Sequence, residues 1–513
     1  MRASHLPLLL LILLLGAALR FHGLARDVRF HPDEAWFSTF ARHAALNGDW
    51  LLRGDLDKPP LSLYASALSM TLVAAQTNAN NVLDFSWRQG EFAARLPNTL
   101  AGMIFIAAMY GLARRLYPDR RLAPWVALFA ALSPFAVAYS PTAFTDGLML
   151  PLVALALWMG AARRWGWAGV WLALAFAAKP QALYALPLVV GLGLTLPPLP
   201  EFREGEQKTA AFFTSSPLGR GGRAVFLFLL PFAVILALLF VWDAARGGAG
   251  MWALAAANNN PARLIRSDEV GTRLGEWAVY GAGLLGSPTA LFALALPLAL
   301  IARVRADWRT RMYRRSTLVD TALLAYILGY GLLHWLVAFN VYDRYLLLVL
   351  PPALLLAVQT GVWVWGALRR FLSRPEVTIA AGAVVISMLS SAWAASNGTA
   401  YDAVQASAER SYAGIPALAA FLNEREFGAI VYDHWLGWPL GYYLGEWTDK
   451  RRVYYPTPAA LASDAPLNPE AAPRYFVAPT DRNADPWLEA LASAGFASAE
   501  VYRAGGFAVW ALR

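Results

Sequence analysis

The chain has 513 residues, of which 58% are hydrophobic and only 15% are charged, and it contains 21 tryptophans. Soluble domains carry about 25% charged residues, so this composition indicates an integral membrane protein. The formal net charge is +9, but the arginines gather between apolar runs, which is typical of cytoplasmic membrane edges and not of nucleic-acid binding. The absence of cysteine excludes disulfides, thiolate metal sites and cysteine nucleophiles.

The amino-terminal part predicts one span followed by a surface helix. Residues 6–25 are apolar behind Arg2, which favours an uncleaved first span with a cytoplasmic amino terminus. Pro32 suits a first helical turn and Asn47-Gly48 suits a helix end, so we expect an amphipathic helix over 32–46 that lies at the membrane surface.

The apolar residues 60–76 are long enough to suggest a second span, but arginine placement argues against it. If they crossed, an arginine cluster further along would face outside, against the positive-inside rule. We therefore expect an interfacial or re-entrant segment. The cluster consists of Arg114, Arg115, Arg120 and Arg121.

The same rule requires residues 166–197 to cross twice, with a hinge at Lys179-Pro180, because proline breaks the helix. About eleven spans, an odd number, then place the carboxyl end outside. Residues 201–223 are predicted to be a cytoplasmic loop and 244–275 an outer loop. The predicted spans are 6–25, 95–116, 122–140, 143–162, the two halves of 166–197, 224–243, 276–302, 317–339, 345–366 and 377–395.

Near residue 396 the hydropathy falls, and the residue pattern becomes that of a soluble domain. Strands and helices alternate there, with a hairpin candidate at Gly505-Gly506, and this predicts a small α/β domain over 396–513 outside the membrane. The expected fold is thus an α-helical polytopic membrane domain over 1–395, with a first outer loop over 26–94, plus this domain. The predicted strands are 428–433, 474–478, 497–503 and 506–511, and the predicted helices are 413–425 and 485–494.

This topology brings several ionisable groups to the outer face. Carboxylates and cations near a membrane are costly unless they are paired or used. Such a set suits transfer of a group from a lipid phosphate, because a carboxylate can take a proton from an attacking hydroxyl while cations neutralise the leaving phosphate. The candidate bases are Asp33, Glu34 and Asp146, and the candidate cations are Lys58, Lys179 and Arg344.

The ordered motifs resemble a known family. They are similar to the polyprenyl-phosphate-sugar-dependent GT-C glycosyltransferases, and within them to the protein O-mannosyltransferases and the bacterial lipid A aminoarabinose transferases. The resemblance covers roughly residues 1–395. The motifs are Pro32-Asp33-Glu34, Asp57-Lys58-Pro59-Pro60-Leu61, Arg95-Leu96-Pro97, Tyr139-Ser140-Pro141 through Asp146, Lys179-Pro180, and Arg344-Tyr345-Leu346 with Pro351-Pro352.

The resemblance implies roles for individual residues. Asp33 would be the catalytic base or acceptor-positioning carboxylate with Glu34 beside it, Asp57 and Lys58 a donor-side pair, and Asp146 a second carboxylate near the sugar. Lys179, Arg344 and Tyr345 would be substrate-binding. Some bacterial members carry glutamate where Asp57 stands and use it in a divalent metal site, so Asp57 is the metal candidate here.

The implied donor is a polyprenyl-phosphate sugar. The implied acceptor is a protein, a glycolipid or a wall glycan at the outer face of a cell membrane. The residues leave two other classes open. One is a transporter or flippase of lipid-linked sugars, which would carry broken helices in two matching halves. The other is an outer domain that binds a partner and is anchored by the membrane part.

Overall fold

A computed structural model describes residues 6–195, 217–259, 263–311, 314–398, 412–468 and 472–513. The chain divides into two compact units. Unit 1 contains residues 1–24, 53–62 and 98–400, and unit 2 contains residues 25–52, 63–97 and 401–513. The first loop therefore belongs largely to the same unit as the carboxyl-terminal residues. Helices α3 (Leu61–Ser69) and α4 (Trp87–Leu116) run through both units.

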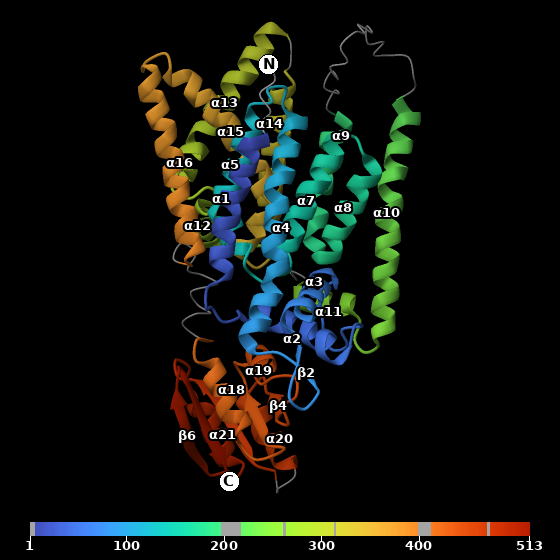
Figure 1. The fold of residues 1–513 in the computed structure, drawn as a ribbon, viewed down its shortest axis with the longest axis vertical. Helices are drawn as coiled ribbons and strands as arrows, with labels where there is room; N and C mark the ends of the chain where they lie inside the picture. Colours follow the sequence, from blue (N-terminus) through green and yellow to red (C-terminus); the bar gives the residue numbers. More distant parts are fainter. Residues whose placement is uncertain (1–5, 196–216, 260–262, 312–313, 399–411, 469–471) are drawn as a thin grey trace. The chain divides into compact units, whose positions relative to one another are not determined.

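Unit 1 is helical (Figure 1). Within the described residues, seven helices, α4 among them, are long and apolar enough to cross a membrane, and several shorter apolar helices accompany them. The chain is thus a multi-pass membrane protein. In chain order the other elements of unit 1 are α1 (Leu6–Leu24), α5 (Leu122–Leu132), α6 (Pro134–Tyr139), α7 (Thr145–Ala161), α8 (Trp165–Ala178), η2 (Pro180–Ala185), α9 (Leu186–Thr195), α10 (Pro217–Arg246), α11 (Met251–Asn259), η3 (Ser267–Glu269), α12 (Val270–Ala282), α13 (Thr289–Thr310), α14 (Arg315–Leu336), η4 (Asp343–Leu348), α15 (Leu350–Leu368) and α16 (Arg374–Ser396).

The helices of unit 1 differ from the predicted spans in several places, and a proline explains one of the differences. The chain bends at Lys179-Pro180, between α8 and η2, as the sequence predicts. The expected span 122–140 is instead two helices, because Pro134 starts α6 after an extended Ser133. Helices α11 and α12 occupy much of the predicted outer loop 244–275. Of the predicted loop 201–223, residues 201–216 lie outside the described residues.

The break before α6 leaves backbone carbonyls that a buried arginine satisfies. Ala130 would pair with the backbone N–H of residue 134, which proline lacks, and the Phe135 N–H donates to Gly283 instead. The guanidinium of Arg20, which is fully buried, donates to the carbonyls of Ala130 and Ala131, each at 3.1 Å. It also donates to the Ser140 hydroxyl and to the Gly16 carbonyl. The charge thus stays solvated by protein groups where no water reaches.

Unit 2 begins with α2 (Pro32–Asn47), which matches the expected helix. Its capping box places His31 at the N-cap and Glu34 at the third position, and Gly48 ends it with a φ of 73° that a residue without a Cβ adopts readily. The prediction that its apolar face rests in the membrane surface is wrong, because that face packs against protein. Trp36 stacks on Trp438 with ring centroids 4.7 Å apart.

The residues that follow α2 in unit 2 include a short helix and a hairpin. The π-helix η1 (Met70–Ala74) extends α3, so that the apolar segment totals 14 residues, less than a membrane span needs. Strands β1 (Gln76–Thr77) and β2 (Leu83–Asp84) pair in an antiparallel hairpin.

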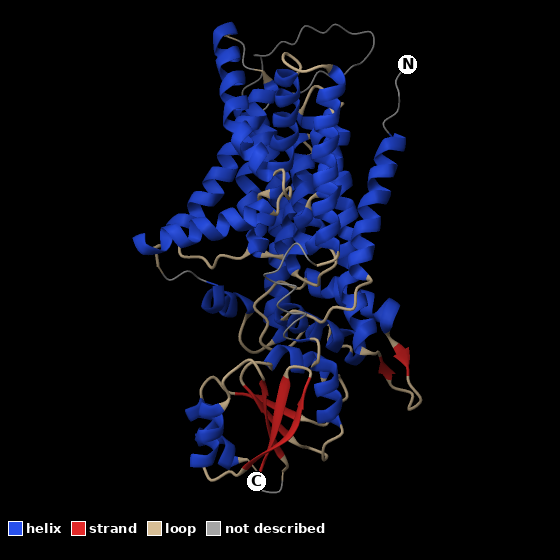
Figure 2. Cartoon of the chain, turned by 90° about the vertical axis from the view of Figure 1, so that its left-hand side faces the viewer, coloured by secondary structure: helices blue, strands red, loops and turns tan. Residues whose placement is uncertain are grey.

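The carboxyl-terminal part of unit 2 is a five-stranded sheet with the order β4-β3-β5-β7-β6 (Figure 2). The first three strands are parallel, and β7 pairs antiparallel with β5 and β6. The predicted α/β domain is confirmed, with one strand, β4, that the sequence pattern did not indicate. Its elements are α18 (Ile415–Asn423), β3 (Ile430–Asp433), α19 (Gly437–Tyr443), β4 (Arg451–Tyr454), α20 (Pro458–Asp464), η6 (Ala465–Leu467), β5 (Arg474–Pro479), α21 (Asp485–Ser493), β6 (Ser498–Ala504) and β7 (Phe507–Leu512).

Candidate functional site

Three cations predicted from the sequence come together in unit 1, and we call Lys58, Lys179 and Arg344 the cation cluster. The Lys179 ammonium donates to both carboxylate oxygens of Asp146, at 2.7 and 2.8 Å. Both side chains are buried, with 7% and 2% of their surfaces exposed. The charges of Arg344 and Lys58 also act on Lys179, so the three cations share one electrostatic environment.

Local structure explains why Lys179 and Asp146 meet. Asp146 stands in the first turn of α7, where the helix dipole favours a negative charge. Helix α8 packs against α7 and ends at Lys179, which has an extended backbone because a proline follows it. The end of α8 is therefore next to the start of α7. Behind Asp146 lies a cavity of about 10 Å³, room for about one water, so this side of the carboxylate is closely packed.

The second pair of the cluster stands on the short segment 53–62. The Lys58 ammonium donates to Asp57 at 2.7 Å, and 16% of the lysine side chain is exposed against 3% of the aspartate. An arginine holds this segment in place: Arg246 donates to the Gly54 carbonyl at 2.7 Å and to the Leu56 carbonyl at 3.4 Å. Sequence reasoning missed Arg246, although a basic residue that closes a 23-residue apolar helix is a usable signal.

Arg344 and Tyr345 lie on η4, just before α15. The Arg344 guanidinium stacks 4.4 Å from the Tyr342 ring and 5.2 Å from the Phe144 ring. The Lys179 ammonium lies 5.1 Å from the centre of the Tyr345 ring. The aromatic rings thus position both cations without neutralising them, as cation–π contacts do.

Three aspartates accompany the three cations of the cluster, so the positive and negative charges are equal in number. Asp57 and Asp146 each pair with a lysine, and Asp343 accepts a hydrogen bond from the Arg344 backbone at 2.7 Å. Of the three cations, Lys58 and Arg344 are the more exposed, and Lys179 is the most buried. An anionic ligand would therefore meet Lys58 and Arg344 before it meets Lys179.

The residues around Asp57 do not fit a metal site. Within the described ranges, no three His, Asp or Glu side chains gather in a group that could hold an ion. Asp57 pairs instead with an ammonium group, which takes the place that a cation would occupy.

Asp33 and Glu34 belong to unit 2, and their surroundings differ. Asp33 is half-buried at the start of α2. Glu34 is 3% exposed and forms a bidentate ion pair with Arg95. The guanidinium donates to the two carboxylate oxygens at 3.0 and 2.9 Å. Arg95 also donates to the Val28 carbonyl at 2.7 Å. The motif residue Arg95 thus fixes Glu34 in place, a link that nothing in the sequence pattern indicated.

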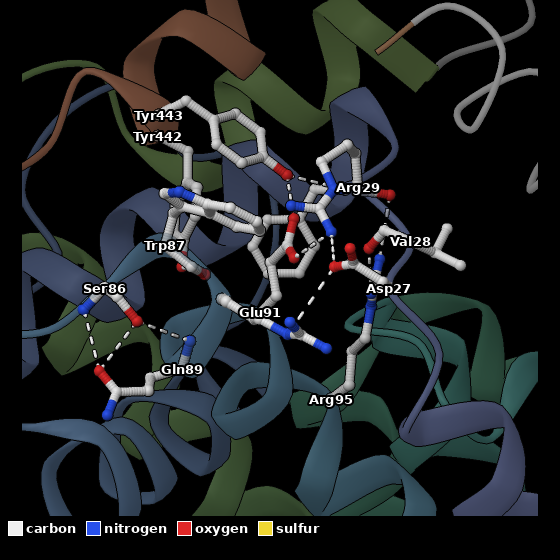
Figure 3. Close-up of polar contacts among 12 residues, drawn as sticks. Asp27, Val28, Arg29, Ser86, Trp87, Gln89, Glu91, Arg95, Tyr442 and Tyr443 are labelled. Carbon is white, nitrogen blue, oxygen red and sulfur yellow. Dashed lines mark hydrogen bonds and ion pairs between the residues drawn. The ribbon is translucent and has the colours of Figure 1, made fainter. Parts of the chain in front are cut away.

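A second polar network of unit 2 was not predicted (Figure 3). The buried guanidinium of Arg29 pairs with Asp27 and lies 3.5 Å from Glu91, and it stacks 4.0 Å from the Trp87 ring. The Tyr443 hydroxyl donates to Glu91. Residues more than 350 positions apart in the chain are thereby joined, which is why a reading of the sequence does not find them.

The predicted site residues therefore fall into two sets. Unit 2 holds Asp33 and Glu34 at the start of α2. Unit 1 holds the cation cluster with its aspartates and the adjoining tyrosine, namely Asp57, Lys58, Asp146, Lys179, Arg344 and Tyr345.

Comparison with known proteins finds one matching family and several similar solved structures. Residues 57–197 match the family model described as dolichyl-phosphate-mannose-protein mannosyltransferase. This stretch contains both lysine–aspartate pairs. No curated protein sequence matches the chain.

Solved structures resemble the chain along almost its whole length. ArnT from Cupriavidus metallidurans in the apo state is 15% identical with a TM-score of 0.63, over 99% of this chain and 98% of ArnT. The same protein bound to undecaprenyl phosphate is 16% identical with a TM-score of 0.62, over the same shares.

A more distant likeness is to the Archaeoglobus fulgidus oligosaccharyltransferase tethered with an acceptor peptide. It is 12% identical with a TM-score of 0.54, over 99% of this chain and 74% of that enzyme. At these identities the likeness concerns the fold. The chain is therefore a polytopic membrane protein of the GT-C fold that resembles the protein O-mannosyltransferases and the bacterial lipid A aminoarabinose transferases.

Proposed function

We propose that this protein is a membrane glycosyltransferase, one that moves a sugar from a polyprenyl-phosphate-linked donor to an acceptor hydroxyl on the extracytoplasmic face. The observation that carries the proposal is the cation cluster, in which the charges of Lys58 and Arg344 both act on Lys179. Three cations held beside an apolar bundle suit a phosphate group on a lipid chain. The match to a mannosyltransferase family over 57–197 supports the same reaction class.

The cluster supplies the leaving-group chemistry. As the bond between the anomeric carbon and the phosphate oxygen breaks, negative charge grows on the polyprenyl phosphate. Lys58 and Arg344 are exposed enough to contact that phosphate, and preorganised cations lower the barrier because they need little reorganisation. Asp146 accepts from the Lys179 ammonium through both carboxylate oxygens and so fixes its position within the cluster.

Asp33 is the proposed general base. The acceptor hydroxyl attacks the anomeric carbon, its proton passes to the Asp33 carboxylate, and the polyprenyl phosphate leaves from the opposite side. One displacement inverts the configuration at the anomeric carbon. Glu34 is suited to a positioning role, because both of its oxygens already accept hydrogen bonds from Arg95.

Two solved relatives support the kinds of substrate. ArnT from Cupriavidus metallidurans was solved with undecaprenyl phosphate, and the archaeal oligosaccharyltransferase with an acceptor peptide. By analogy, we take a polyprenyl phosphate as the lipid of the donor and a protein, glycolipid or wall glycan as the acceptor. The proposed location is the cell membrane.

The Asp33→Asn variant tests the assignment of the base. Purified protein in lipid nanodiscs would be given radiolabelled polyprenyl-phosphate sugars extracted from the host, together with host envelope acceptors. We expect Asp33→Asn to lower transfer by at least about 100-fold, because general-base catalysis contributes about 10² to 10⁴. The Asp481→Asn variant removes an exposed carboxylate of the same unit and serves as the matched control. Wild-type turnover in the Asp33→Asn variant would remove Asp33 from the mechanism.

A further inference from the structure

Unit 2 contains an open groove that none of the residues proposed for catalysis lines. Its volume is about 660 Å³, within the range of about 300 to 1,000 Å³ that small-ligand pockets occupy. Three chain segments form its walls: residues 26–29, the first residue of α4, and residues 413–417 at the start of α18. The residues that matter here are Arg26, Asp27, Arg29, Trp87, Pro416 and Ala417.

The aromatic part of the groove is fixed before any ligand arrives. The Trp87 indole is half-buried, and the Arg29 guanidinium stacks 4.0 Å from the ring centre. Figure 3 draws both side chains. Arg29 itself is 5% exposed and is held by its ion pairs to Asp27 and Glu91. A ring held in this way keeps its orientation, so little conformational entropy is lost when a ligand packs on it.

Polar groups surround this ring. The Asp27 side chain is 57% exposed although it pairs with Arg29, and the Arg88 guanidinium, 66% exposed, lies 3.8 Å from it. Arg26 also lines the groove. The part of the lining that α18 contributes consists of small and apolar residues such as Pro416 and Ala417, which leave room for a bulky occupant.

We infer that this groove binds a saccharide segment of the acceptor. The inference rests on the proposed function, because it names the chemistry of the acceptor. A pyranose ring has one apolar C–H face, which packs on an indole, and an equatorial rim of hydroxyl groups. Planar carboxylate and guanidinium groups accept from and donate to neighbouring hydroxyls. Trp87 with Asp27 and Arg26 offers both kinds of contact in one groove.

A peptide is the competing occupant, and this groove suits it less well. Extended peptides are commonly recognised by the backbone of an exposed strand edge or by a groove that fits a helix. The walls here come from a loop and from the starts of two helices, α4 and α18. Recognition would therefore depend on side chains, as it does for sugars.

The test measures binding separately from turnover. The full-length protein in nanodiscs would be titrated with mannotetraose, a neutral probe, and with tetragalacturonate, an acidic probe, and observed by saturation-transfer difference NMR. Ala417→Trp places a large ring into the groove from an exposed helix position. Ala420→Trp adds the same ring at an exposed position of α18 outside the groove lining and is the control.

We expect at least one probe to bind the wild type. Ala417→Trp should raise its Kd at least about tenfold, as loss of a central contact does, while Ala420→Trp should leave the Kd within about twofold. Trp87→Phe should weaken binding less than Trp87→Ala does, because a smaller ring still packs. The inference is overturned if neither tetrasaccharide binds the wild type, or if the two tryptophan variants bind the probe equally well.

The two proposals fail separately. If the wild type transfers sugar and Ala417→Trp leaves the Km for acceptor unchanged, the groove does not bind the acceptor. That result would not contradict the proposed glycosyltransferase activity. Saccharide binding that Ala417→Trp removes, in a protein that transfers no sugar, would support the groove and contradict the proposed reaction.

Discussion

Lys179 and Asp146 form a buried ion pair in which one ammonium group meets both carboxylate oxygens, at 2.7 and 2.8 Å. The pair joins the end of α8 to the start of α7 across 33 positions of sequence. Either charge would be costly to bury alone. The pair therefore either stabilises the fold or holds Lys179 in place for function.

Single and double variants of this pair separate the two roles. Asp146→Asn leaves the Lys179 charge buried without its carboxylate and should destabilise the protein by about 3 to 5 kcal/mol. The double variant Asp146→Asn/Lys179→Met removes both charges and should recover thermal stability in detergent while transfer stays below about 1% of wild type. Full activity in the stable double variant would show that the pair serves the fold alone.

Arg246 is predicted to position the Asp57–Lys58 pair. Its guanidinium spans the carbonyls of Gly54 and Leu56, and the shorter, single-headed ammonium of lysine cannot span both. Arg246→Lys should therefore raise the Km for the polyprenyl donor about tenfold with a smaller change in kcat, a pattern typical of a lost binding contact. Arg263→Gln, which alters an exposed arginine, is the control. An unchanged donor Km would show that segment 53–62 keeps its position without the hydrogen bonds from Arg246.

Glu34 and Asp33 are expected to behave differently although they are neighbours. Glu34→Gln breaks the paired contact with Arg95, so the main loss should be in folding or thermal stability, by several kcal/mol. Asp33→Asn should leave the melting temperature within a few degrees of wild type while transfer is lost. Thermal unfolding and transfer assays on the same preparations compare them. The reverse pattern would make Glu34 the base.

The sheet of unit 2 predicts a pH dependence of stability. Burial raises the pKa of the Asp433 carboxyl to about 6, because the ionised form is poorly solvated there. In the unfolded chain the pKa of an aspartate is about 3.9, so the folded state binds the proton more tightly. The free energy of unfolding therefore falls as pH rises from about 4 to about 6. The loss reaches at most about 3 kcal/mol and is constant above that range.

Asp433→Asn should remove this part of the pH dependence, because the amide does not titrate. The measurement is the unfolding midpoint of the full-length protein and the variant from pH 4.5 to 7.5. The unfolding midpoint of the variant should rise relative to that of the wild type as pH increases. A constant difference between the two curves would mean that Asp433 ionises normally in the folded protein.

Charge patterning along the chain predicted much of the fold. The helix that begins at Pro32, the hinge at Lys179-Pro180 and the α/β domain follow from turn residues and periodicity, and the structure confirms these elements. The predicted placement of that helix on the membrane surface was wrong, because its apolar face packs against protein. Strand β4 was missed because its sequence, Arg451-Arg452-Val453-Tyr454, lacks a clear apolar alternation, as befits an edge strand.

Contacts that depend on tertiary structure could not be read from the sequence. The role of Arg20 follows from the helix break at Pro134, which becomes visible only when α1 packs beside α5. The pairing of Glu34 with Arg95 joins residues 61 apart, and neither periodicity nor capping rules connect them. Sequence reasoning found which residues are polar in an apolar chain, and the fold decides which of them meet.

The most direct test of the central claim is a stoichiometric one. Purified protein in liposomes would be given a polyprenyl-phosphate sugar labelled in both the sugar and the lipid, together with acceptor. Glycosyl transfer predicts that one free polyprenyl phosphate appears for each labelled sugar joined to acceptor, and that a Lys58→Gln/Arg344→Gln variant produces neither. Movement of the intact donor across the bilayer, with its glycosidic bond unbroken, would contradict the claim and favour a transporter.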